Sequence, residues 1–147
     1  MPPRRVSRPQ RAAAAVALFL VLAGSSALAL DPLKVVRDFC RSDALGDRLD
    51  PRTLPAVSAL VSWPLEPAWD RIFLIKGYEI STPRQEEKAV TLEVTYTLTA
   101  QVRAGKVVHD ERLEVRAFRL SSDDNGATWR ILGPPPSPHV FDTRFDA

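Results

Sequence analysis

The sequence feature that most constrains the fold is a run of uninterrupted alternation from Val90 to Arg103. Every second side chain is apolar, and the residues between are polar or charged; the apolar set is Val90, Leu92, Val94, Tyr96, Leu98, Ala100 and Val102. A period of two places the apolar side chains on one face of a strand, and one buried face with one solvated face is typical of an antiparallel sheet. The run is much longer than the usual strand of about five or six residues. We therefore expect a long antiparallel strand that bends or coils.

A tight turn at Ala104-Gly105 follows this strand and predicts a hairpin with the segment after it. Pairing across the turn sets apolar residues against apolar ones and acids against bases. The predicted pairs are Val102–Val107, Ala100–His109, Leu98–Glu111, Tyr96–Leu113 and Val94–Val115 on one face, with Glu93–Arg116 and Thr97–Arg112 on the other. Phe118 and Leu120 take the opposite parity, so we predict a β-bulge just after Ala117.

The segment before the strands predicts helices. Asp31-Pro32 offers an N-cap acceptor followed by a proline at the first helical position. Apolar residues then recur at spacings of three and four until Gly46, forming one stripe: Leu33, Val36, Phe39, Cys40 and Ala44. A second short helix is expected from Asp50-Pro51 to Val61.

Two more strands and a tail complete the expected order. A strand is predicted over Arg71–Thr82, a turn or loop over Pro83–Glu87, and a last strand over Thr128–Leu132. A proline-rich tail begins at Gly133, and its two phenylalanines lead us to expect that it docks on the domain. The fold class is therefore α+β, with N-terminal helices packed on a curved antiparallel sheet of about four strands.

This order of elements resembles the NTF2-like (cystatin-like) superfamily. The features that carry the resemblance are the leading helices, the long paired strands and the closing strand Trp129-Arg130-Ile131. The resemblance implies that the leading helix packs into the concave side of a strongly bent sheet. It covers most of residues 30–147, which we expect to form a single domain.

The N-terminal segment has the three-part layout of a secretory signal peptide. Four arginines precede an uncharged stretch from Ala12 to Ala23, and small residues then lead to a small-x-small site that favours cleavage after Ala29. Residues 1–29 are thus interpreted as a signal peptide, and the protein is expected to be secreted or periplasmic. The alternative is an uncleaved membrane anchor, because the stretch up to Leu30 carries no charge.

Removing that segment changes the charge and the function classes that the charge suggests. The whole chain has a net charge of +2, but four of its twenty basic residues lie in the segment, which leaves a charge of about −2 on residues 30–147. The apparent basicity is then a targeting signal, and we expect no nucleic-acid partner. The single Cys40 cannot form an intramolecular disulfide and lies on the apolar stripe, so it is interpreted as a core residue.

A short motif lies just before the last predicted strand. Its pattern, Ser-x-Asp-x-Gly-x-Thr-Trp, looks like the Asp-box of sialidases, with Ser122, Asp124, Gly126, Thr128 and Trp129 in the motif positions. Sialidases carry several copies on a propeller, which one copy in a domain of this size cannot build. We interpret the motif as a structural hairpin turn, in which the serine and aspartate accept backbone amides and the glycine takes a positive φ.

The candidate pocket residues are Tyr96, His109 and Glu111. The predicted register sets His109 and Glu111 on the apolar face near Tyr96, so that the tyrosine could donate a hydrogen bond and either partner act as general base. The resemblance adds that ketosteroid isomerase, of the same superfamily, uses Tyr and Asp in that hollow, whereas no Asp can be placed on the buried face here. The alternative is a tyrosine at the pocket rim and a His–Glu pair near the hairpin end. No residue is therefore assigned a catalytic role.

Three function hypotheses remain open. The preferred one is an exported non-catalytic domain that binds an apolar small molecule or a partner protein. The others are a small acid–base enzyme of ketosteroid-isomerase type and a structural accessory protein of the envelope, with a homodimer as a possible assembly. No cofactor is expected, and His139 with Asp142 does not supply enough ligands for a metal site.

Overall fold

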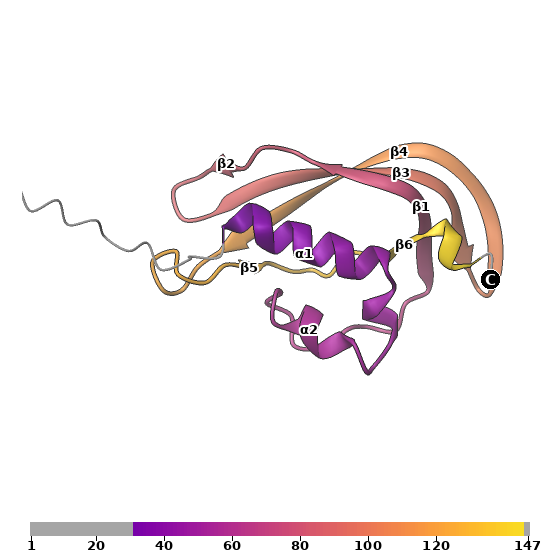
Figure 1. The fold of residues 1–147 in the computed structure, drawn as a ribbon, viewed down its shortest axis with the longest axis horizontal. Helices are drawn as coiled ribbons and strands as arrows, with labels where there is room; N and C mark the ends of the chain where they lie inside the picture. Colours follow the sequence, from indigo (N-terminus) through magenta and orange to yellow (C-terminus); the bar gives the residue numbers. More distant parts are fainter. Residues whose placement is uncertain (1–30, 146–147) are drawn as a thin grey trace, which may run out of the picture.

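Three long strands form the centre of the sheet in the computed structural model, which describes residues 31–145. They are β1 (Arg71–Ile80), β3 (Val90–Arg103) and β4 (Lys106–Ser121), and β3 pairs antiparallel with both β1 and β4. The strands curl strongly at one end, so the sheet forms an arch (Figure 1). The predicted long, bent strand is confirmed with the predicted bounds, Val90 and Arg103.

Three short strands complete a mixed sheet. They are β2 (Arg84–Gln85), β5 (Arg130–Ile131) and β6 (His139–Phe141), in the order β5-β4-β3-β1-β6 with β2 beside β3. The prediction of about four strands, all antiparallel, is wrong, because the sheet has six strands within residues 31–145 and β6 runs parallel to β1. Strands of two or three residues are too short to show an alternation, and a parallel pairing is made by a crossing connection that local sequence does not reveal.

The bulge in the β3–β4 hairpin lies elsewhere than predicted. Near the turn the predicted pairs Val102–Val107 and Ala100–His109 are confirmed. The next pair is Leu98 with Arg112, so β4 holds one extra residue between His109 and Arg112, and every later pair is shifted by one from the prediction. The observed partners are Leu98–Arg112, Thr97–Leu113, Tyr96–Glu114, Val94–Arg116 and Glu93–Ala117. Phe118 and Leu120 then face inward without a bulge after Ala117.

The helices lie on the concave side of the arch. Helix α1 (Pro32–Ala44) is capped by Asp31, whose side chain accepts a hydrogen bond from the backbone of Leu33 at 3.1 Å, as predicted. A 3-10 turn η1 (Asp47–Leu49) follows, and helix α2 (Leu54–Ser58) is shorter than expected. Figure 1 shows α1 lying along the inside of the arch, with α2 on its far side. No helix among residues 31–145 is long and apolar enough to cross a membrane.

Helix α1 and the sheet enclose the core. The ring of Phe39 lies 6.0 Å from Trp63 and 5.6 Å from Phe118, measured between centroids, and Cys40 is buried beside it, as predicted. The inner faces of β3 and β4 supply a further part of the core: Val90, Leu92, Val94, Leu98 and Leu120. The domain is therefore α+β, with a helix packed on one face of a curled sheet.

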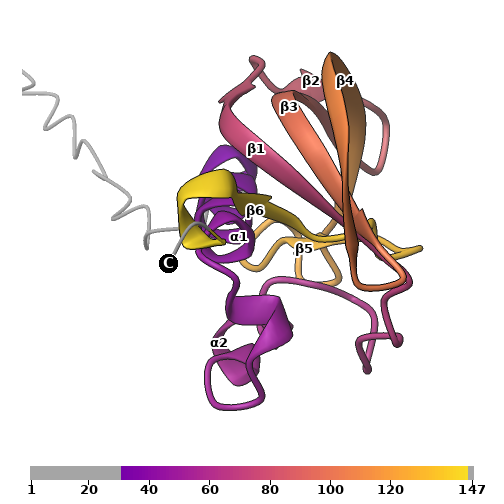
Figure 2. The same ribbon diagram turned by 90° about the vertical axis from the view of Figure 1, so that its right-hand side faces the viewer.

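The C-terminal segment closes the far edge of β1. Strand β6 pairs with Phe73–Ile75, and a last 3-10 turn, η2 (Asp142–Arg144), follows it. Figure 1 shows β6 at the C-terminal end of α1, beside β1, and Figure 2 views the domain from that side. The expectation that this tail docks on the domain is confirmed.

Replacing the central core ring tests the packing. We predict that Phe39→Ala lowers the free energy of unfolding by about 3–5 kcal/mol, because it leaves a cavity among rings that cannot collapse onto one another. Urea unfolding followed by tryptophan fluorescence measures the change. Phe145→Ala is the matched control, since Phe145 is 44% exposed and should cost less than about 1 kcal/mol. Equal losses for the two variants would contradict this assignment of the core.

Candidate functional site

A buried histidine lies at the centre of a polar cluster on the concave side of the sheet. His139, the first residue of β6, is 1% exposed, and its ring stacks between Tyr96 (3.9 Å between centroids) and Phe73 (5.0 Å). Its Nε2 lies 3.2 Å from Oε1 of Glu114 on β4. Its Nδ1 lies 4.0 Å from Oδ2 of Asp43 on α1 and has no hydrogen-bond partner among the described residues.

On the helix side, the cluster continues through a buried arginine. Asp43 accepts hydrogen bonds from the backbone of His139 at 3.1 Å and from Nη1 of Arg48 at 3.2 Å. Burial raises the pKa of Asp43, although the Arg48 guanidinium opposes the shift. Arg48 also donates to Glu66 at 2.9 Å and to the carbonyl of Pro136 at 2.8 Å. Three segments distant in sequence are thereby joined at one buried cation.

On the sheet side, the cluster ends in a ladder of charges along β4. Glu114 accepts from His139, from Arg116 Nε and from Arg112 Nη2, and Arg112 also pairs with Asp110 at 3.0 Å. Burial raises the pKa of Glu114, but the hydrogen bonds and charges of His139 and Arg116 outweigh it and lower the pKa to about 2. An ionised carboxylate only accepts, so Nε2 of His139 carries a proton.

Tyr96 lies inside this cluster rather than at a pocket rim. The residue is 1% exposed, and its hydroxyl is 3.7 Å from Sγ of Cys40. Burial raises the pKa of both groups, that of the Cys40 thiol to about 12. The thiol is therefore not a nucleophile at neutral pH.

The structure does not bring the other two candidate residues to Tyr96. The side chains of His109 and Glu111 are 77% and 63% exposed, and 3.8 Å separates His109 Nε2 from Glu111 Oε1. His109 pairs with Ala100, four residues along β3 from Tyr96. The acid and base that do lie near the tyrosine are Glu114 and His139.

Sequence reasoning missed these two residues for separate reasons. The predicted register turned Glu114 to the wet face, and the true bulge position would have placed it inside. His139 was considered only with Asp142, as a loop residue after the prolines. Among residues 31–145, no three His, Cys, Asp or Glu side chains are grouped to hold a metal ion.

The cluster presents little surface to a substrate. Tyr96 and His139 are almost fully buried, and α1 covers them from the concave side. We interpret the cluster as a structural network of hydrogen bonds and ion pairs that holds α1, the sheet and the C-terminal segment in one arrangement.

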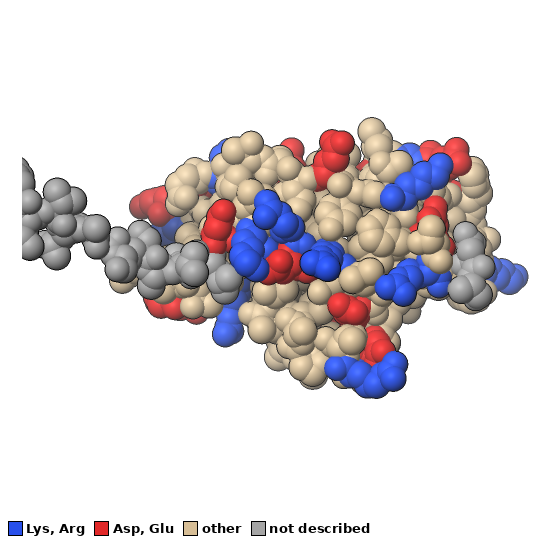
Figure 3. Space-filling model, in the orientation of Figure 1, with Lys and Arg blue, Asp and Glu red and all other residues tan. Residues whose placement is uncertain are grey.

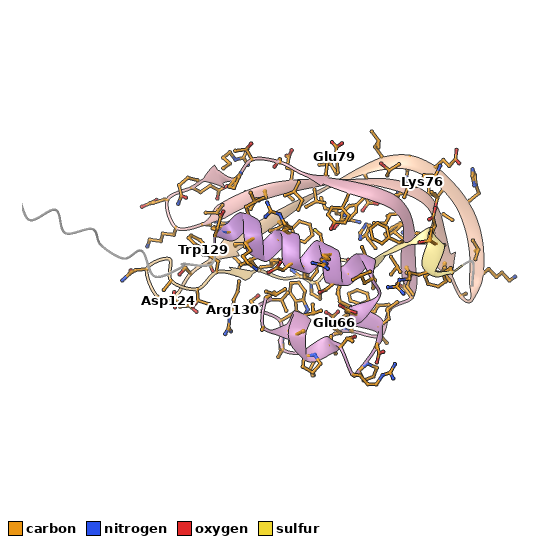
Figure 4. The ribbon with its side chains drawn as sticks, viewed as in Figure 1. Glu66, Lys76, Glu79, Asp124, Trp129 and Arg130 are labelled. Atoms are coloured by element: carbon orange, nitrogen blue, oxygen red, sulfur yellow. The ribbon has the colours of Figure 1, made fainter. Side chains whose placement is uncertain are left out.

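The Asp-box-like motif forms a hydrogen-bonded turn at the opposite end of the domain. Asp124 Oδ1 accepts from the Ser122 hydroxyl at 2.8 Å and from the Thr128 amide at 2.7 Å, while Ser122 Oγ accepts from the Gly126 amide at 2.8 Å. The hydrogen bond from Ser122 and those from Thr128 lower the pKa of Asp124. Figure 4 shows Asp124, Trp129 and Arg130 together at this end, where a groove of about 470 Å³ runs past Asp124 and Arg130.

The most exposed part of the sheet is the outer edge of β4. Strand β5 pairs only with Leu120 and Ser121, and the Leu132 amide donates to the Arg119 carbonyl at 2.8 Å. From Lys106 to Phe118, this edge has no partner strand in the described part of the chain. Figure 2 shows β4 at the margin of the sheet, away from α1 and α2.

This edge strand also carries an unusual share of exposed apolar side chains. Leu113 is 67% and Val115 58% exposed, and Val107 and Val108 are exposed nearer the turn. Val115 pairs with Thr95 of β3, and Thr95 pairs with Glu79 of β1, so the three side chains share one face of the sheet. Figure 4 shows Glu79 projecting from the outer face. Leu113 and Val115 therefore form an apolar row on the face away from the core. Long exposed apolar edges are sites of association.

Charge does not single out another surface in the view of Figure 3. Lysines and arginines alternate with aspartates and glutamates over the face shown, and no extended area of one sign appears on it. No family model, no curated protein and no solved structure matches this chain. The β4 edge is therefore the candidate functional site that the geometry itself supports.

The depressed pKa of Glu114 predicts a pH dependence of stability. A carboxylate whose folded pKa lies below its unfolded value stabilises the fold above the unfolded pKa, about 4.5, and loses that contribution as pH falls toward about 2. We expect Glu114→Gln to cost on the order of 2 kcal/mol at pH 6 and progressively less as pH falls from 4.5 to 2. Urea unfolding across this range measures it. Glu79→Gln, on the exposed outer face, is the control, and a Glu114→Gln cost independent of pH would refute the assignment.

The turn motif gives a second test of stability. Gly126 has φ +89°, a conformation that costs an L-residue about 1–2 kcal/mol, so we expect Gly126→Ala to lower the free energy of unfolding by that amount. Gly77→Ala is the matched control, because Gly77 lies outside that region of φ and a Cβ there meets no atom within 4 Å. Thermal unfolding followed by circular dichroism compares the two. A harmless Gly126→Ala would show that the turn does not need glycine.

Proposed function

We propose that this chain is an exported, non-catalytic domain that binds a partner protein through the outer edge of β4. The observation that carries the proposal is the open stretch from Lys106 to Phe118, with Leu113 and Val115 exposed along it. An open edge presents a row of backbone donors and acceptors, and an added strand satisfies them while apolar side chains give the contact its specificity.

A protein partner has more support than a small apolar ligand. The concave side of the sheet, where a small molecule was expected, is filled at Tyr96 by contacts with Cys40 of α1 and His139 of β6. The same contacts give the acid–base alternative no comparable support, since the reactive groups nearest the tyrosine are inside the cluster. The outer face of β4, by contrast, is accessible along its length.

Export is proposed from the N-terminal sequence, which lies outside the described residues. Its cationic start, uncharged stretch and small-x-small site are those of a signal peptide. The domain suits such a route because its one cysteine is buried. In an oxidising compartment it would form no intramolecular disulfide and would present no accessible thiol.

Site-specific photo-crosslinking tests the proposed interface. A photoreactive amino acid replaces Leu113 or Val115 in the full chain expressed in a secreting host, and irradiated samples are analysed by mass spectrometry. We expect one covalent adduct of defined mass from both positions. The control is Leu65, an equally apolar residue that is 80% exposed but lies in a loop away from β4.

The pattern of adducts decides the outcome. Adducts from both β4 positions and none from Leu65 support the proposal, and Leu113→Lys should remove the adduct formed at position 115. Adducts of the same mass from all three positions, or none from β4, would overturn it. Circular dichroism of the Leu113→Lys variant checks that its fold is intact, which the exposure of this residue leads us to expect.

A further inference from the structure

Resting on the proposed function, we infer that the partner is a second copy of this chain. Two β4 edges would pair antiparallel across a two-fold axis that passes through Leu113, giving one continuous sheet through both molecules. An isologous contact of this kind needs a surface that is complementary to itself.

The Leu113-centred register is complementary in charge. It sets Arg112 of each copy opposite Glu114 of the other and brings Arg116 beside Asp110, which shares a face with Arg112 through their ion pair. On the outer face, the Leu113 side chains of the two copies lie opposite each other. Val115 of each copy is the diagonal neighbour of the other copy's Leu113. Four exposed apolar side chains thus cover one another.

The two adjacent registers place like charges together. A Glu114-centred pairing opposes two glutamates and sets Arg112 against Arg116, while an Arg112-centred pairing opposes two arginines and sets Glu114 against Asp110. Like charges directly opposite in a sheet are destabilising. Shifts by one residue are excluded, because opposite residues of an antiparallel pair share a face.

A Val115-centred register also pairs opposite charges but fits the edge less well. Only residues 112–118 of each copy would then lie opposite open edge, whereas the Leu113-centred register uses 108–118. The second copy would also place residues 106–111 beyond Phe118, where Ile131 and Leu132 already lie beside β4, whereas the Leu113-centred register places only Lys106 and Val107 there. The end of the open edge therefore favours the Leu113-centred register.

Cysteine scanning tests both the dimer and its register. In Leu113→Cys the two introduced thiols face each other at a distance that a disulfide spans, so we expect a covalent dimer under mild oxidation on a non-reducing gel. In the control, Val115→Cys, the new thiol faces Glu111 of the other copy and should remain monomeric on the same gel. Cys40 is buried and does not compete.

Sedimentation velocity of the unmodified chain gives an independent measurement. We expect a dimer, and we expect Leu113→Lys to raise its dissociation constant at least about 10-fold, since two lysines would oppose each other on the axis. A disulfide from Val115→Cys in place of Leu113→Cys, or a monomer at all concentrations, would overturn the inference. A monomer whose β4 still crosslinks to a different protein would leave the proposed function standing, whereas no crosslink from β4 would remove both.

Discussion

The position of one extra residue in β4 governs how the two faces of the sheet are used. Because the strand holds an additional residue between His109 and Arg112, everything after it changes face relative to a regular hairpin. Glu114 is turned inward, where His139 and Arg116 can pair with it, and Leu113 is turned outward. The buried cluster and the exposed apolar row are thus two results of the same irregularity. Moving the bulge would bury a leucine and expose the carboxylate.

The inward side of that irregularity explains why a polar cluster can persist in a small core. Each charged member has a partner: Asp43 has Arg48, Glu114 has two arginines, and the histidine lies between them. Removing one partner from such a set leaves a buried charge without compensation, which is costly. The cluster therefore favours one arrangement of α1, β4 and β6 over others that would bury a similar apolar area.

Elements with a strong period were predictable, and those made by distant contacts were not. The alternation from Val90 to Arg103 and the cap at Asp31 appear in the structure where the sequence placed them. The hairpin register was right for two pairs and then wrong, because either bulge position satisfies the alternation. They are distinguished by the contact of Glu114 with His139, which comes from the distant strand β6. The parallel strand β6 and the role of His139 depend on contacts across most of the chain, for which a single sequence carries no local signal.

The bond between Asp43 and the backbone of His139 joins residues that are 96 positions apart. Contacts of such long sequence separation form late, since a large loop must close before they contribute. A chain that leaves the ribosome or a translocation channel from its N-terminus would therefore lack strand β6, and the histidine at the centre of the polar cluster, until residues 139–141 emerged. For a protein exported as proposed, this delay would leave the fold incomplete during transport. The sheet and the polar cluster would then be completed only in the compartment where the protein works.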